Sequence, residues 1–299
     1  MDNELAQSPL RRRCHVHQPP NEEPMPMKDF RDKEVLITGS ASGIGRETAL
    51  AFAEAGARLW LADVDETGNQ ETARLVRDKG TTGHPLHCNV ADETSVRAMA
   101  EEVHGEIEAL DVLMNNAGVG TAGRFLDTTL ENWRRTLDIN LMGVVHGCHA
   151  FLPNMVARGE GGHVINTASA AGYYAAPDIP VYAASKFAVQ GFTEALRADM
   201  AQHSIGVTAI CPGIIDTPIV AKSVMEGKMS EGDRQSKIVD FYHKRNYTPA
   251  QVAQAILKAV RHNVAVQPVS PEAWGLYVAK RLTPGVLGRL SRSELPFLK

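Results

Sequence analysis

Two side chains four positions apart, Tyr182 and Lys186 in the pentapeptide YAASK, could act together on one chemical step. On a helix, side chains at positions i and i+4 lie on the same face, so the lysine charge can lie near the phenol oxygen. A neighbouring ammonium stabilises a phenolate, which is a base. A surface pair in which the lysine stem covers the tyrosine ring has the same spacing. Motifs elsewhere in the chain are needed to distinguish a catalytic Tyr/Lys pair from a surface packing contact.

A glycine-rich turn, TGSASGIG at residues 38–45, follows the first apolar run of the chain. Its three glycines permit a tight turn and a close approach of the backbone, and the helix that follows presents free N–H groups to a pyrophosphate. A plain Gly/Ser loop is the alternative, but a place between the first strand and the first helix favours a nucleotide site. The sequence therefore predicts cofactor contacts at Gly39, Ser42, Gly43, Ile44 and Gly45.

An acidic residue, Asp63, lies at the end of the second predicted strand, 18 residues after Gly45. A carboxylate at this place can hydrogen-bond both ribose hydroxyls of an adenosine and repels a 2'-phosphate. Asp63 could instead cap the next helix, although Asp65 competes for that position. We expect the ribose contact, and with it NAD rather than NADP.

Short apolar runs alternate with longer amphipathic stretches from residue 34 onward, which is typical of strands and helices around a parallel sheet. This rhythm predicts an α/β fold with a doubly wound, seven-stranded parallel sheet in a single domain. The polar, Met-rich segment 214–247 interrupts the rhythm, and we interpret it as a mobile insertion. The expected strands are 34–38, 58–63, 83–88, 111–115, 162–168, 205–211 and 264–267. The expected helices are 43–56, 66–79, 92–108, one long helix within 129–158, 181–203 and 248–261.

Composition excludes several classes of function. The 299 residues are 43% hydrophobic and 22% charged, and a formal net charge of -4 gives no basic excess for binding nucleic acid. Four scattered cysteines lack metal-binding spacing, so we expect reduced thiols, no metal and a cytoplasmic protein. No apolar run is long enough to cross a bilayer. Residues 1–30, rich in proline, are expected to form a disordered tail.

These motifs, together with NNAG at residues 115–118, NTAS ending at Ser169 and YAASK, resemble the short-chain dehydrogenase/reductase family in its single-domain NAD(P)-dependent branch. The resemblance covers about residues 31–268 and implies a Rossmann-type fold. It also implies that Tyr182 is the general base or acid, with Lys186 tuning its pKa and holding the nicotinamide ribose. Ser169 would donate to the substrate oxygen, and Asn140 would hold a water that connects the lysine to solvent.

The same resemblance implies further cofactor contacts. The segment CPGIIDT at residues 211–217 matches the family's loop over the nicotinamide carboxamide. Asn89 and Val90 stand where relatives commonly carry Asp-Val against the adenine, and an amide oxygen can still accept from the adenine amino group. The contacts implied are Asn89, Val90, Asn116, Gly118, Pro212, Gly213, Ile215 and Thr217, besides Tyr182 and Lys186.

The leading interpretation is therefore an oxidoreductase that transfers a hydride between NAD and a secondary alcohol or ketone. Two alternatives are an NADPH-dependent ketone or 3-oxoacyl reductase, and a cofactor-sensing regulator without catalysis. The first usually needs a basic residue where this chain has Ser42 and Asp63, and the second would lack the tyrosine or the lysine. The pocket walls 119–125, 170–180 and 214–247 supply apolar and aromatic groups, which favours a steroid, terpenoid, aryl or fatty alcohol. The family also implies a homodimer or homotetramer through the helices at 129–158 and 181–203.

A C-terminal extension, residues 269–299, continues beyond the last predicted strand. Trp274, Tyr277, Val278, Arg281 and Leu282 have the spacing of an amphipathic helix edged by basic residues, and Pro284 and Gly285 divide the extension into two helices. Packing on the core or on another subunit is the favoured interpretation. A lid over the substrate pocket ranks second, and contact with an anionic membrane ranks last.

Overall fold

A seven-stranded parallel sheet forms the centre of the protein in a computed structural model that describes residues 26–290. The strand order is β3-β2-β1-β4-β6-β7-β9. Both faces of the sheet are covered, so its strands are apolar on both sides, as in β1, where Val35, Leu36 and Ile37 are fully buried. The strands are β1 (Glu34–Thr38), β2 (Arg58–Asp63), β3 (Gly83–His87), β4 (Val112–Asn115), β6 (Gly162–Thr167), β7 (Ile205–Pro212) and β9 (Val266–Val269).

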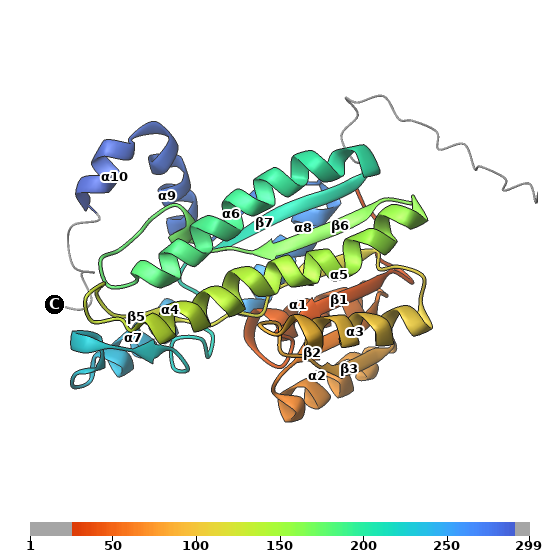
Figure 1. The fold of residues 1–299 in the computed structure, drawn as a ribbon, viewed down its shortest axis with the longest axis horizontal. Helices are drawn as coiled ribbons and strands as arrows, with labels where there is room; N and C mark the ends of the chain where they lie inside the picture. Colours follow the sequence, from red (N-terminus) through yellow and green to blue (C-terminus); the bar gives the residue numbers. More distant parts are fainter. Residues whose placement is uncertain (1–25, 291–299) are drawn as a thin grey trace, which may run out of the picture.

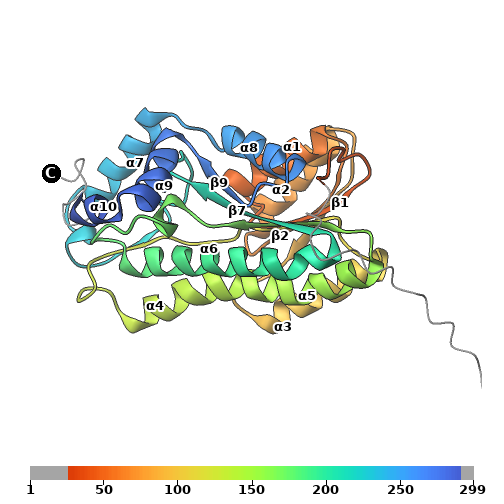
Figure 2. The ribbon, with the colours of Figure 1, turned by 90° about the horizontal axis from the view of Figure 1, so that it is seen from above.

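Helices pack on both faces of this sheet, as Figure 2 shows. One face carries α1 (Gly43–Glu54), α2 (Glu66–Asp78) and α8 (Pro249–Arg261). The other face carries α3 (Glu93–Glu106), α4 (Leu130–Leu137), α5 (Gly143–Arg158) and α6 (Pro180–Met200). The chain order reverses between β1 and β4, and ligands of open α/β sheets bind at such a point, outside the carboxyl ends of the strands. The predicted doubly wound, Rossmann-type fold is confirmed.

Three details differ from the sequence-based expectation. The single helix expected within 129–158 is divided into α4 and α5 by a π-helical turn, Asp138–Met142, which contains Asn140. The last strand, β9, lies two residues later than expected and includes Pro268. Proline is tolerated there because β9 is an edge strand, where one side of the backbone has no partner strand.

The third detail is Phe30, which lies within the predicted N-terminal tail. This side chain is only 1% exposed and packs edge-on against Phe52 of α1, with ring centroids 4.9 Å apart. Burying an aromatic ring of this size stabilises the fold, so the packed part of the chain begins at least at Phe30. Most of the predicted tail, residues 1–25 with Cys14, lies outside the described residues, as do residues 291–299.

The segment 214–247 contains β8 (Val224–Met225), a 3-10 turn (Gly227–Ser230) and α7 (Arg234–Arg245). Strand β8 pairs with β5 (Thr121–Ala122), and Val220, Met229 and Ile238 form a small apolar cluster with Ala122. The C-terminal extension forms α9 (Pro271–Leu282) and α10 (Pro284–Leu290). In Figures 1 and 2, α7, α9 and α10 gather at the same end of the molecule. Two further 3-10 turns are Ala170–Gly172 and Ala201–His203.

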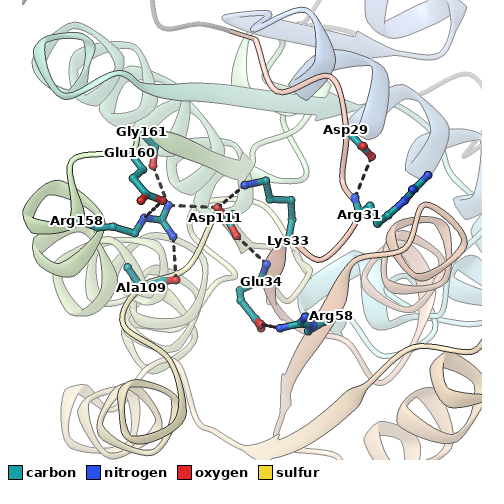
Figure 3. Close-up of polar contacts among 10 residues, drawn as sticks. All are labelled: Asp29, Arg31, Lys33, Glu34, Arg58, Ala109, Asp111, Arg158, Glu160 and Gly161. Carbon is teal, nitrogen blue, oxygen red and sulfur yellow. Dashed lines mark hydrogen bonds and ion pairs between the residues drawn. The ribbon is translucent and has the colours of Figure 1, made fainter.

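An ionic network ties together the amino-terminal ends of the central strands, and Figure 3 shows it around Asp111. Asp111 accepts from the Glu34 amide at 2.9 Å and pairs with Lys33 at 3.1 Å and Arg158 at 3.3 Å. Arg158 also donates to the carbonyl oxygens of Ala109 and Gly161. These contacts join β1, β4 and the start of β6 at the edge of the sheet opposite to the strand ends that bind ligands.

Candidate active site

Helix α6 places Tyr182 and Lys186 on one face, one turn apart, as their spacing predicts. Pro180 occupies the first position of the helix, where a proline has no hydrogen bond to lose. The Lys186 side chain is buried, with 4% exposure, and its Nζ donates to the carbonyl oxygen of Thr167 at 2.8 Å. The same nitrogen lies 5.8 Å from the centroid of the Tyr182 ring. The pair is therefore not a surface contact.

Burial governs the protonation of this pair. It raises the pKa of Tyr182, and the neighbouring Ser169 hydroxyl acts in the opposite direction but does not outweigh it. Burial also lowers the pKa of Lys186 to about 8, because the ammonium has lost most of its hydration. The lysine was expected to lower the pKa of the phenol. In this structure its ammonium is directed at the Thr167 carbonyl, and the phenol pKa lies above its ordinary value.

Ser169 and Asn140 occupy different layers of the site. The Ser169 hydroxyl lines the cavity, accepts from the Ala171 amide at 3.1 Å and donates to the Pro212 carbonyl at 3.4 Å. Asn140 is fully buried behind the cavity wall. Its amide group exchanges two hydrogen bonds with the backbone of Val119, at 2.8 and 3.0 Å, and donates to Ser185 Oγ at 3.1 Å.

Gly118 separates Asn140 from the cavity and brings it close to Lys186. A Cβ added at Gly118 would lie 3.2 Å from Asn140 Oδ1 and 3.6 Å from Lys186 Nζ. A Cβ here would be tight against Asn140 Oδ1 and in ordinary contact with Lys186 Nζ. The π-helical turn that carries Asn140 is the local feature that aims this amide at the backbone of the neighbouring loop.

The glycine-rich turn gives the cavity a helix N-terminus. Gly39 has a φ of +68°, and a Cβ added at Gly45 would lie 2.1 Å from the Gly39 carbonyl oxygen, so a side chain at position 45 would push the turn apart. Ser42 caps α1 without a side-chain hydrogen bond to the described residues, and the first turn of α1 holds no acidic residue. The amide groups of that turn and their partial positive charge suit a pyrophosphate.

Asp63 lies at the carboxyl end of β2, beside this turn. Its Oδ2 accepts from the Ala41 amide and its Oδ1 from the Asp65 amide, both at 2.9 Å. The carboxylate is thus fixed in place, and each of its oxygens can accept a further hydrogen bond. The cap of α2 is Asp65, whose side chain accepts from the Gly68 amide at 3.0 Å. Asp63 is therefore not the helix cap, and it lines the cavity.

Most of these groups line one cavity of about 580 Å³. Two of the predicted site residues, Gly45 and Asn140, do not line it and support it from behind. Asn89 accepts from the Ala91 amide at 3.2 Å through its side-chain oxygen. The predicted residues that line the cavity are Gly39, Ser42, Gly43, Ile44, Asp63, Asn89, Val90, Asn116, Gly118, Ser169, Tyr182, Lys186, Pro212, Gly213, Ile215 and Thr217.

Two cavity residues come from the C-terminal extension, which is not one of the predicted walls. Glu272 and Leu276, one turn apart on α9, face the cavity from the C-terminal extension. Their spacing marks one helix face, but no local pattern indicates that this face meets the cavity. Tyr242 and Lys222, which also line the cavity, come from the predicted wall 214–247, and Tyr174 comes from 170–180.

Comparison with known proteins decides the family. A sequence profile described as short chain dehydrogenase matches residues 33–227, which is more than half of the chain. The chain belongs to the short-chain dehydrogenase family. Two solved structures that the chain resembles, at 28% and 26% identity, were determined with NAD bound.

Individual relatives agree with this family. The oxidoreductase EphD of Mycobacterium tuberculosis is 42% identical over 267 residues, which are 88% of this chain and 45% of EphD. The chain thus spans about half the length of that relative. Human epidermal retinol dehydrogenase 2 is 36% identical over 198 residues, 65% of this chain and 64% of that protein. A crystal structure of a Burkholderia phymatum family member in complex with NAD matches with a TM-score of 0.77 and 28% identity, covering 88% of this chain and 97% of the other.

Proposed function

We propose that this short-chain dehydrogenase oxidises a bulky, apolar secondary alcohol to a ketone with NAD, or catalyses the reverse reduction. The observation that carries the proposal is the arrangement of one cavity. Tyr182, Ser169 and Lys186 lie at one end of it, and the helix N-terminus and Asp63 lie at the other. A dinucleotide bound between the two ends would bring its nicotinamide to the tyrosine.

Each side chain has a role that its contacts support. NAD supplies the hydride acceptor. Tyr182 would accept the hydroxyl proton of the alcohol as a phenolate, a form that the positive charges of Lys186 and of an oxidised nicotinamide favour against the burial that raises the phenol's pKa, and Ser169 would donate a hydrogen bond to the alcohol oxygen. Lys186 is held by the Thr167 carbonyl, and its ammonium would be available to a ribose hydroxyl of the nicotinamide half of a bound dinucleotide. Asn140 fixes the loop at Val119 through two hydrogen bonds and so supports the cavity wall next to Gly118.

The preference for NAD over NADP rests on Asp63. Its carboxylate is held by two backbone amides and cannot turn away from the ribose without breaking them. A 2'-phosphate placed beside it would meet a like charge, whereas a 2'-hydroxyl would find an acceptor. The Burkholderia phymatum protein, with which this chain shares its fold, was crystallised with NAD.

The substrate end of the cavity supports an apolar alcohol. Ala170, Ala176 and Ile179 line it from the loop before α6, Leu276 lines it from α9, and the phenols Tyr174 and Tyr242 face it. The hydroxyl of Tyr242 has no hydrogen-bond partner among the described residues, and burial raises its pKa to about 12, so it would stay neutral. The human relative named retinol dehydrogenase is consistent with a long apolar alcohol.

A panel of alcohols tests this proposal. Wild-type protein is incubated with steroid, terpenoid, aryl and fatty secondary alcohols, each with NAD or NADP, and the absorbance of the reduced nicotinamide is followed. We expect turnover with NAD for at least one bulky alcohol, and a lower kcat/KM for short alcohols and for NADP. Turnover confined to NADP, or to charged sugars and small acids, would contradict the proposal.

We further propose that the protein assembles as a homodimer or homotetramer through α5 and α6. Phe187 on α6 is 36% exposed, and Met142, just before α5, is 38% exposed, so both leave apolar surface on the helix layer. Light scattering at micromolar concentration should give a dimer or tetramer. A monomer would contradict this assembly.

A further inference from the structure

In the loop after β7, residues 213–216, all but one of the backbone N–H groups donate a hydrogen bond to another described residue. Gly213 donates to the Val269 carbonyl at 3.1 Å, and Asp216 donates to the Tyr247 carbonyl at 2.9 Å. Ile214 donates to a side chain, Glu272 Oε1, at 2.8 Å. The amide of Ile215 has no acceptor among the described residues, and Ile215 lines the cavity. One N–H group of this loop is therefore left for a ligand.

Glu272 is the side chain that accepts a hydrogen bond from a backbone amide of this loop. It belongs to the first turn of α9, 58 residues beyond Ile214. Its side chain is 24% exposed and pairs with Arg245 at the end of α7. The contact with the loop is close, because a Cβ added at Gly213 would lie 2.5 Å from Glu272 Oε1. Burial acts to raise the pKa of Glu272, but the hydrogen bond from the Ile214 amide, together with the polar groups beside it and the Arg245 charge, outweighs burial and lowers that pKa. The group is thus a carboxylate at neutral pH.

Helix α9 is itself anchored beside the catalytic residues. Ala273 is fully buried, and its carbonyl accepts from Tyr173 Oη at 3.0 Å. The rings of Tyr173 and Tyr277 pack edge-on, with centroids 5.6 Å apart. Tyr173 follows Ser169 by four residues, so the loop of the catalytic serine and the helix that carries Glu272 are held together.

We propose that Glu272 is a positioning residue for the nicotinamide end of the cofactor. By accepting from Ile214, it fixes the loop in a conformation that leaves the Ile215 N–H without an acceptor among the described residues, so that a carboxamide oxygen bound in the cavity could accept from it. Arg245 holds the carboxylate in place through its other oxygen, Oε2. The C-terminal extension is in this way part of the cofactor site. This inference rests on the proposed nicotinamide-dependent function.

Calorimetric titration with two ligands tests the role without using activity. NAD contains the nicotinamide, and ADP-ribose is the same molecule without it. Glu272→Ala should weaken NAD binding about tenfold, the value of one charge-assisted hydrogen bond, and should leave ADP-ribose affinity within twofold. Glu272→Gln keeps an acceptor oxygen and should lose no more than about threefold for NAD. Glu101→Ala, an exposed glutamate of α3, is the matched control and should bind both ligands as wild type does.

The ligand pair separates positioning from a general structural role. Equal losses for NAD and ADP-ribose in Glu272→Ala would show that the variant disturbs the whole site, and the proposal would be wrong. Unchanged NAD affinity in Glu272→Ala would also overturn it, as would a Glu272→Gln loss as large as that of Glu272→Ala. The two proposals fail in different ways. If wild-type protein binds no NAD, the proposed NAD-dependent function is wrong. If wild type and Glu272→Ala bind NAD equally well, only the role of Glu272 is wrong.

Discussion

Replacing Lys186 by methionine should change how the stability of the protein depends on pH. The pKa of Lys186 falls from 10.5 to about 8 on folding, because the ammonium is buried. Below pH 8 the folded and the unfolded chain both carry the proton, and the burial cost is fully present. Between about pH 8 and 10.5 the unfolded chain binds more protons, so this contribution to stability rises with pH. Methionine has a similar length and carries no charge, so it removes this term.

The magnitude follows from the two pKa values. From pH 7 to 9.5 the lysine term should stabilise wild type by about 2 kcal/mol relative to Lys186→Met. Denaturant unfolding of both proteins across that range gives the difference between their free energies of unfolding at each pH. The titration of all other groups contributes equally to both proteins and cancels in this difference. Lys258→Met, at an exposed position of α8, is the control for removal of a lysine. A difference between wild type and Lys186→Met that stays constant with pH would refute the buried, destabilised ammonium.

Three further results are expected. Tyr182→Phe should lower kcat at least about a hundredfold and keep NAD affinity within twofold, because it removes the proton acceptor but not the ring; retention of a tenth of the wild-type rate would exclude Tyr182 as the base. Asp63→Ser should reduce the preference for NAD over NADP by about tenfold to a hundredfold in kcat/KM, and an unchanged ratio would show that another group selects the cofactor. Asp111→Ala should lower the free energy of unfolding by about 3 kcal/mol, because Arg158 is left without its buried partner. NAD affinity should stay unchanged. A loss of stability under about 1 kcal/mol would contradict the importance of the ionic network in Figure 3.

The sequence predicts the sheet and its flanking helices because their signals are local. An apolar run such as residues 34–38 must be buried on both faces, and the glycines of residues 38–45 leave few other conformations for the turn. The four catalytic candidates follow from the resemblance of their motifs, in their order along the chain, to those of the family. Three of them, Ser169, Tyr182 and Lys186, line one cavity, and Asn140 lies behind its wall, because parallel strands bring their carboxyl ends to one edge.

Other features depend on contacts that no short pattern encodes. The π-helical turn at Asn140 does not interrupt the helical pattern of apolar residues, so the sequence predicts one continuous helix there. Phe30 is a single aromatic residue next to a proline-rich stretch, and its burial depends on α1. Glu272 meets Ile214 only because β9 and α9 place it beside the loop, and the raised pKa of Tyr182 reflects burial by the whole site.

Transfer of deuterium from an alcohol to the cofactor tests the central claim most directly. A secondary alcohol that wild type oxidises is labelled at the carbinol carbon, and the reduced nicotinamide is analysed by mass spectrometry after incubation with wild type or Tyr182→Phe. We predict that wild type transfers the label to NAD and that the variant transfers at least about a hundredfold less in the same time. Reduced cofactor without the label would contradict hydride transfer from the alcohol. Equal labelling by Tyr182→Phe would contradict the role of Tyr182 as the general base.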